Sequence, residues 1–137
     1  MFYFSDHHLH TLFYETVREE DKYITVVLVK KSLKINSFED LKGRKACFPV
    51  YDGIAWNSVV QVLNKEKLLN TCPYTKAMAE FFGDSCVPNV PEQYRGTLGK
   101  GCTSEGYQDD YGAIKCLNNG GEVAFVSRNS FKKFLNG

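Results

Sequence analysis

The sequence has 137 residues, which suits one domain that buries roughly two thirds of the surface its unfolded chain exposes. It is 43% apolar and 14% aromatic with a net charge of +1, which argues for a globular domain and against a protein that binds nucleic acid through its charge. No apolar run approaches the roughly 20 residues that span a bilayer. Residues 1–10 also lack the basic flank and continuous apolar run of a secretory signal peptide.

We divide the chain into a lead, residues 1–21, and an incomplete domain, residues 22–137. The lead shows no sustained hydrophobic period, so we expect it to be poorly ordered or the remnant of a preceding domain. Its histidines, His7, His8 and His10, lack the partners and spacing of a metal site. Residues 23–31 (Y-I-T-V-V-L-V-K-K) are almost all β-branched or aliphatic and predict a strand buried on both faces.

Elements that alternate between strand and helix follow along the chain. We predict a short helical turn over residues 37–43, a strand over 44–48 and a helix from Ile54 with one apolar face formed by Trp56, Val59, Val60 and Leu63. Further predicted elements are helices over 74–82, 111–118 and 129–136 and a third buried strand over 122–127. Residues 83–105, rich in proline and glycine, predict an irregular loop. This alternation indicates an α/β fold.

The junction over residues 44–57 is the place where an anion would bind. An apolar strand runs there through a Pro/Asp/Gly turn into a helix, and a helix N-terminus offers unpaired N–H groups and a partial positive charge. Asp52 directly precedes Gly53, Ile54 and Ala55, and an aspartate at the N-cap turns its carboxylate onto these amides. We therefore expect the protein's own Asp52 to occupy the anion seat.

Five cysteines are scattered along the chain without a C-x-x-C pair, which fits disulfides better than a zinc site or a redox dithiol. Cys86 and Cys102, both in the irregular loop, are the natural pair. Because the count is odd, either one thiol is free or the chain is a piece of something larger.

Six segments in register from Tyr23 to the end resemble the second domain of a transferrin lobe. They are Y-I-T-V-V-L-V-K-K, L-K-G-R-K-A-C, A-W-N at a helix start, F-F-G-D-S-C-V-P, Y-G-A-I-K-C-L and G-G-E-V-A-F-V. The cysteine pattern is closer to the C-terminal lobe of an arthropod (insect) transferrin than to a vertebrate protein. The resemblance implies a periplasmic-binding-protein-like (type II) α/β domain, a mixed sheet flanked by helices and stabilised by disulfides.

The resemblance also implies pairings and partners. Cys47 would pair with Cys116 and Cys86 with Cys102, while Cys72 matches a cysteine whose partner lies beyond this chain. The chain would be a fragment of a secreted iron-transport protein, not an enzyme. Its partners would be the remainder of the lobe, the other lobe and a receptor, with neither nucleic acid nor membrane among them.

The family carries ferric iron with carbonate, held by two tyrosines from this domain together with ligands from elsewhere in the lobe. Tyr23 stands where the first tyrosine belongs, but the second position holds Asp110, with Tyr111 one step further on. Successive residues point in different directions, so Tyr111 is not an equivalent ligand. Paired acids such as Asp109 and Asp110 would also suit the cap of the helix that follows.

The carbonate seat departs further from the family pattern. Pro49 replaces a threonine, and the arginine that would grip carbonate is missing from a stretch one residue shorter, flanked by Asp52 and Gly53. We therefore expect a degraded site in which Tyr23 and Asp110 are vestigial and Asp52, Gly53, Ile54 and Ala55 form an inactive anion seat, so that this chain binds no iron.

Two alternatives remain open from the sequence. Ferric iron could still bind through Tyr23 and Asp110, with Asp52 in place of carbonate, because carboxylates are good ligands for hard cations. An enzyme of the Cys/His or Ser/His/Asp kind would need free cysteines and a placed histidine, and every histidine lies in the lead.

Overall fold

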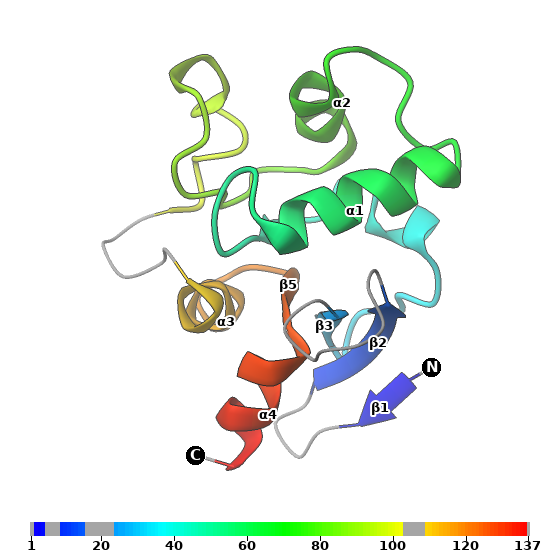
Figure 1. Cartoon of the computed structure of the whole chain (residues 1–137), viewed down its shortest axis with the longest axis vertical. Coiled ribbons are helices and arrows are strands. Elements are labelled where there is room, and N and C mark those ends of the chain that lie inside the picture. Colours follow the sequence, from blue (N-terminus) through cyan, green and yellow to red (C-terminus); the bar gives the residue numbers. More distant parts are fainter. Residues whose placement is uncertain (1, 5–8, 16–23, 103–108, 137) are drawn as a thin grey trace.

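A computed structural model describes residues 2–4, 9–15, 24–102 and 109–136. Its centre is a mixed five-stranded sheet in the order β1-β2-β3-β5-β4 (Figure 1). β3 runs antiparallel to β5 and β4 runs parallel to it. The strands are β1 Phe2–Phe4, β2 Leu9–Glu15, β3 Ile24–Lys30, β4 Ala46–Cys47 and β5 Val123–Ser127.

Helices cover both sides of the central strands β3 and β5 (Figure 1). They are α1 Ile54–Lys65, α2 Tyr74–Phe81, α3 Asp110–Asn118 and α4 Arg128–Asn136, with 3-10 turns η2 Phe38–Leu41 and η3 Glu92–Tyr94. Each α-helix begins within one residue of its predicted start. None of the helices in the described ranges is long and apolar enough to cross a membrane.

β3 is buried on both faces, as its unbroken apolar sequence predicts. Val27 and Val29 pack into the core under α1 and α2, whereas Val26 and Leu28 pack into a second core under α3 and α4. Since neighbouring side chains of a strand point to opposite faces, one strand can supply both cores. β3 is therefore the wall shared by the two layers of helices.

Phe48, directly after β4, lies at the centre of the larger core and is fully buried. Its ring centroid lies 4.7 Å from Phe125 in a stacked arrangement, and 5.2 Å from Trp56 and 5.9 Å from Phe82 in edge-to-face arrangements. These are favourable aromatic geometries. The cluster joins β4, β5, α1 and the end of α2, and so fixes where α1 starts relative to the sheet.

The beginning of the chain differs from the expected unstructured lead. Within residues 1–21, β1 and β2 form strands, and β2 pairs antiparallel with β3 from Leu9 opposite Lys30 to Glu15 opposite Ile24. Hydrophobic periodicity missed these strands because the segment mixes aromatic and polar residues without regular alternation. The division into a lead and a domain at residue 21 stays a prediction.

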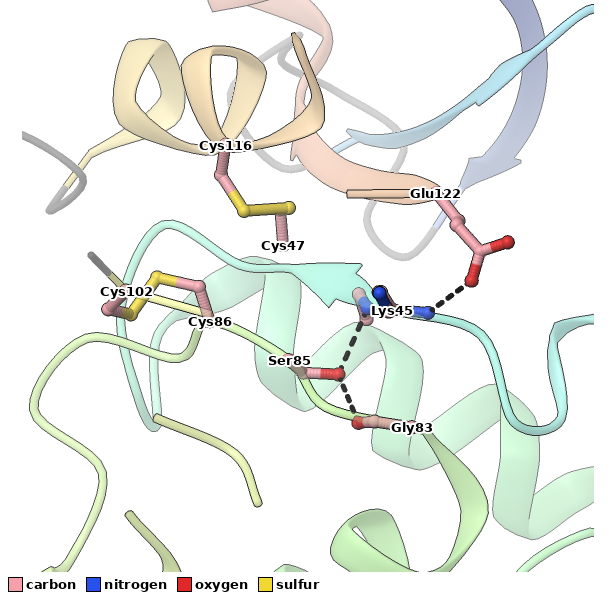
Figure 2. The surroundings of a disulfide bond; sticks show 9 residues. Lys45, Cys47, Gly83, Ser85, Cys86, Cys102, Cys116 and Glu122 are labelled. Atoms are coloured by element: carbon pink, nitrogen blue, oxygen red, sulfur yellow. Dashed lines mark hydrogen bonds between the residues drawn. A yellow bond between two sulfur atoms is a disulfide. The ribbon is translucent and has the colours of Figure 1, made fainter. Parts of the chain in front are cut away.

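Two disulfides meet beside β4: Cys47–Cys116 links β4 to α3, and Cys86–Cys102 closes a loop next to it (Figure 2). These are the two pairs that the family resemblance implies. Cys47 and Cys86 lie opposite each other in a parallel bridge. Near them, the Ser85 hydroxyl donates to the Gly83 carbonyl (2.8 Å) and accepts from the Ala46 amide (2.9 Å). The segment around Cys86 therefore covers the outer edge of β4.

Gly121 is confined by this disulfide. A Cβ at this position would lie 2.5 Å from the Cys47 sulfur and 3.0 Å from the Cys116 carbonyl oxygen. We expect Gly121→Ala to lower the free energy of unfolding by about 1–3 kcal/mol, the usual cost of overpacking. Urea denaturation measures it. Gly96→Ala is the control, because a Cβ at Gly96 meets nothing within 4 Å, and equal stabilities of the two variants would contradict the prediction.

Candidate functional site

A cavity of about 270 Å³ lies where the N-termini of α1 and α3 meet the sheet. Its wall combines two strand residues, the segment leading into α1, the first turn of α1 and the first residue of α3. The lining residues are Thr25, Pro49, Val50, Gly53, Ile54, Ala55, Asp110 and Ser127. Three separate elements therefore bring polar groups to one place.

Asp110, the first residue of α3, is held in the cavity wall by a hydrogen bond. Its Oδ2 accepts from the Ser127 hydroxyl at 2.8 Å, and the Ser127 Oγ accepts in turn from the Ser130 amide at 3.1 Å. The Ser127 oxygen accepts from the Ser130 amide and an ionised carboxylate can only accept, so the Ser127 hydroxyl donates its proton to Asp110.

Thr25 and Ser127 face the cavity together because they are cross-strand partners in the β3–β5 ladder. Directly opposite residues of an antiparallel pair project to the same face. Thr25 is only 1% exposed.

The N-terminus of α1 faces the same cavity without a side-chain cap. Gly53 is the N-cap residue, in extended conformation, and its carbonyl accepts from the Asn57 amide at 3.0 Å. The amides of Ile54 and Ala55 donate to none of the described groups. These first-turn N–H groups are therefore free to bind an acceptor.

The expectation that Asp52 occupies the anion seat is wrong. Asp52 adopts a left-handed backbone conformation (φ 59°) outside the helix, and its Oδ1 accepts instead from the Asn57 side-chain amide at 3.1 Å. Because Asn57 lies one turn into α1, its hydrogen bond holds the Asp52 carboxylate beside the helix and not over its first amides. Asp52 does not line the cavity, and the amides that it was expected to cap stay open.

Asp109 and Tyr111 flank Asp110 but have other roles. Asp109 is the N-cap of α3, and its Oδ1 accepts from the Gly112 amide at 2.7 Å, so one of the paired acids is the predicted helix cap. Tyr111 is 50% exposed and does not line the cavity. The one-residue shift between Asp110 and Tyr111 therefore places only the aspartate at the site.

Of the residues predicted for the site, the structure brings together Asp110, Gly53, Ile54 and Ala55, and it leaves Asp52 outside. Tyr23 lies outside the described residues. The sequence reasoning missed Thr25 and Ser127. The signal for both was present, since each is a hydroxyl residue near one end of an otherwise apolar strand.

A second cavity of about 260 Å³ lies beside the disulfides, at the other end of β4 and near the end of α3. Its charged groups include Asp84 and Lys100, which pair with each other at 3.3 Å. Cys47 and Cys116, which line it, are buried, and none of the described residues predicted for iron or anion binding lines it. The first cavity is therefore the stronger candidate. Among the described residues, no histidine lines either cavity.

Comparison with known proteins gives one consistent match. Residues 6–134 match the family model described as Transferrin. The chain is 35% identical over 123 residues to serotransferrin-A of Xenopus laevis, an alignment that covers 79% of this chain and 17% of that protein. It is 30% identical to the transferrin of the insect Manduca sexta, covering 93% of this chain and 20% of that protein.

A solved structure agrees with the sequence comparisons. The structure of transferrin 1 from Manduca sexta superposes with a TM-score of 0.68 at 32% identity, covering 79% of this chain and 16% of that chain. The cockroach Blaberus discoidalis has a transferrin that is 30% identical and of which the match covers 20%. The chain thus spans about a fifth or less of the length of these relatives.

Proposed function

The chain belongs to the transferrin family, and from this premise we propose two things. The chain is part of one lobe of an extracellular iron-transport protein, and this lobe does not itself bind ferric iron. The identity and contacts of Asp110 support the proposal that this lobe does not bind iron. Asp110 stands where the resemblance expects a tyrosine ligand, and its carboxylate is already engaged by Ser127 at 2.8 Å.

The donor set of the cavity fits ferric iron and carbonate poorly. Ferric iron is a hard cation that needs several anionic oxygen ligands, and Asp110 is the one ionisable side chain among the described residues that line the cavity. Carbonate would face this carboxylate without the arginine that the family pattern supplies. Pro49 contributes neither a hydroxyl nor an N–H. Each of these differences lowers the affinity for the iron–carbonate pair.

The extracellular setting and the lack of catalysis are also part of the proposal. Two disulfides in one small domain are typical of proteins that mature in an oxidising compartment. The described residues that line the cavity offer a carboxylate and hydroxyls but no oriented nucleophile and base. Transport or a structural role beside an iron-carrying lobe suits the family better than a reaction.

Titration of the complete lobe with ferric iron in bicarbonate tests this function. We expect no visible tyrosinate-to-iron absorption band in the wild-type lobe, with a family member of intact ligand set as the positive control. The rival function, iron bound through Tyr23 and Asp110, predicts a band that Asp110→Ala abolishes. A band of that behaviour would overturn the proposal.

A further inference from the structure

The two disulfides are neighbours because one cysteine of each belongs to the same cross-strand pair. Cys47 and Cys86 lie opposite each other in a parallel bridge, and both are buried in one core cluster. The side chains of such a pair project to the same face, and neighbouring strands lie about 4.7–4.9 Å apart. This spacing falls within the roughly 4.4–6.8 Å between Cα atoms that a disulfide requires. Cys47 and Cys86 therefore meet the distance requirement for a bond to each other, although each is bonded to another cysteine (Figure 2).

The segment that carries Cys86 lies between β4 and the segment that carries Cys102. On one side, the Cys86 amide donates to the Ala46 carbonyl of β4 at 2.8 Å. On the other side, the amide of Gly101, next to Cys102, donates to the Ser85 carbonyl at 3.0 Å. Of the two cysteines in this disulfide, Cys86 is thus the one that stands against β4.

Access and charge distinguish the sulfurs. Cys102 is half-buried, whereas the other three disulfide cysteines are buried, and access helps to decide which sulfur a thiolate attacks. The cavity of about 260 Å³ beside the disulfides is lined by Lys45 and by the ion pair of Lys100 with Asp84. These three side chains carry a net positive charge, and positive charge near a sulfur favours its thiolate form. A thiolate from solution therefore reaches Cys102 first.

We propose that Cys102 is a site of covalent modification by a small thiol of the glutathione class, and that this modification moves the other disulfide from Cys47–Cys116 to Cys47–Cys86. In the first step, the small thiolate bonds to the Cys102 sulfur and the Cys86–Cys102 bond breaks, which releases Cys86 as a thiolate. In the second step, the Cys86 thiolate bonds to the Cys47 sulfur and the Cys47–Cys116 bond breaks. Cys116 leaves as a thiolate and takes a proton from water, as the small thiol gave one to water. Two disulfide bonds are present before and after, so no oxidant or reductant is consumed.

The exchange changes how α3 is attached to the sheet. The native Cys47–Cys116 bond joins β4 to α3, and the exchanged chain has no covalent bond between them. Packing alone then holds α3, whose first residue, Asp110, lines the cavity under α1. The inference goes beyond the proposed function and does not depend on whether iron binds.

Reduced glutathione tests the proposal on the folded chain. After incubation without denaturant, free thiols are blocked with N-ethylmaleimide and tryptic peptides are identified by mass spectrometry. Trypsin places the five cysteines in separate peptides, because a lysine or arginine lies between each successive pair. We expect glutathione on Cys102, a linked Cys47–Cys86 peptide and blocked Cys116 to increase together. Cys72, an exposed free thiol, should be blocked throughout and join no disulfide.

Two single variants test which cysteine performs the second step. Cys102→Ala leaves the Cys86 thiol opposite Cys47, so the Cys47–Cys86 bond should form without any glutathione. Cys86→Ala is the matched control, because it opens the same loop, with a sequence separation of 16, but leaves Cys102 as the free thiol. We expect the linked Cys47–Cys86 peptide of the first variant to exceed the linked Cys47–Cys102 peptide of the second about tenfold or more.

Two results would overturn the proposal. One is a Cys102→Ala chain that is folded by circular dichroism, keeps the Cys47–Cys116 bond and contains no linked Cys47–Cys86 peptide. The other is a wild-type chain in which Cys47–Cys86 forms only at urea concentrations that unfold it, together with pairs that include Cys72. That outcome would mark random reshuffling of an unfolded chain and not an exchange built into the fold.

Discussion

The double substitution Cys47→Ala and Cys116→Ala is expected to lower the free energy of unfolding by about 4 kcal/mol. The bridge joins residues 69 apart in sequence. In the chain-entropy model a closed loop of that length lowers the entropy of the unfolded chain and so stabilises the folded state by about 4 kcal/mol. Domains of this size have only about 5–15 kcal/mol in total, so the melting temperature should fall by about 10–15 °C. Urea and thermal unfolding under oxidising conditions measure both quantities.

Two control variants separate loop closure from the loss of any cysteine. Cys86→Ala with Cys102→Ala opens a loop of 16 residues and should cost about 3 kcal/mol in the same model. Cys72→Ala should change little, because Cys72 is an exposed free thiol. If the variant without Cys47–Cys116 is as stable as Cys72→Ala, the bridge is not a main source of stability.

Ferric iron and bicarbonate are expected to bind a lobe that carries Pro49→Thr, Asp52→Arg and Asp110→Tyr, where the wild-type lobe shows no band. The tyrosine supplies a phenolate. Asp52 itself lies outside the cavity, but the longer arginine side chain can reach in from this position and supply charge-assisted hydrogen bonds to the carbonate. A hydrogen bond to a charged group is worth about 1.5–3 kcal/mol, so the arginine alone should raise carbonate affinity about tenfold to a hundredfold. The tyrosinate-to-iron band measures the gain.

Single variants show which change matters. Asp110→Tyr alone should give a weak band, and Pro49→Thr alone should give none. Arginine at position 52 carries a cost of about 1–2 kcal/mol, because Asp52 has a left-handed backbone conformation. If the triple variant folds and shows no band, the site lacks more than these three groups, and our account of how iron binding was lost is wrong.

The fold was largely predictable because its elements carry strong local signals. β3 is apolar along its whole length and proved to be buried on both faces, and Val59 and Leu63 of α1 repeat at helical spacing and proved to be core residues. At these positions the residues that the sequence pattern predicts to be buried are buried in the structure. β1 and β2 were missed because their pairing with β3, a non-local interaction, defines them more than their own sequence does.

The cavity was only partly predictable. Sequence located the start of α1 but assigned Asp52 as its cap, since aspartate before glycine at a helix start usually caps. Asp52 does not cap the helix because the side-chain amide of Asn57 donates a hydrogen bond to the Asp52 carboxylate. Thr25 and Ser127 could be recognised as a pair only once the β3–β5 register was known.

The position of β5 in the sheet also has a consequence for biosynthesis. β3, at residues 24–30, has as its central partner a strand at residues 123–127, and β4 too pairs with that late strand. At synthesis rates of about 5–20 residues per second, β3 emerges roughly 5–20 s before β5 exists. During that interval the backbone edge of β3 that pairs with β5 has no strand beside it. We therefore expect this part of the nascent chain to depend on chaperones until β5 is made, and to fold only after residue 127 has been translated.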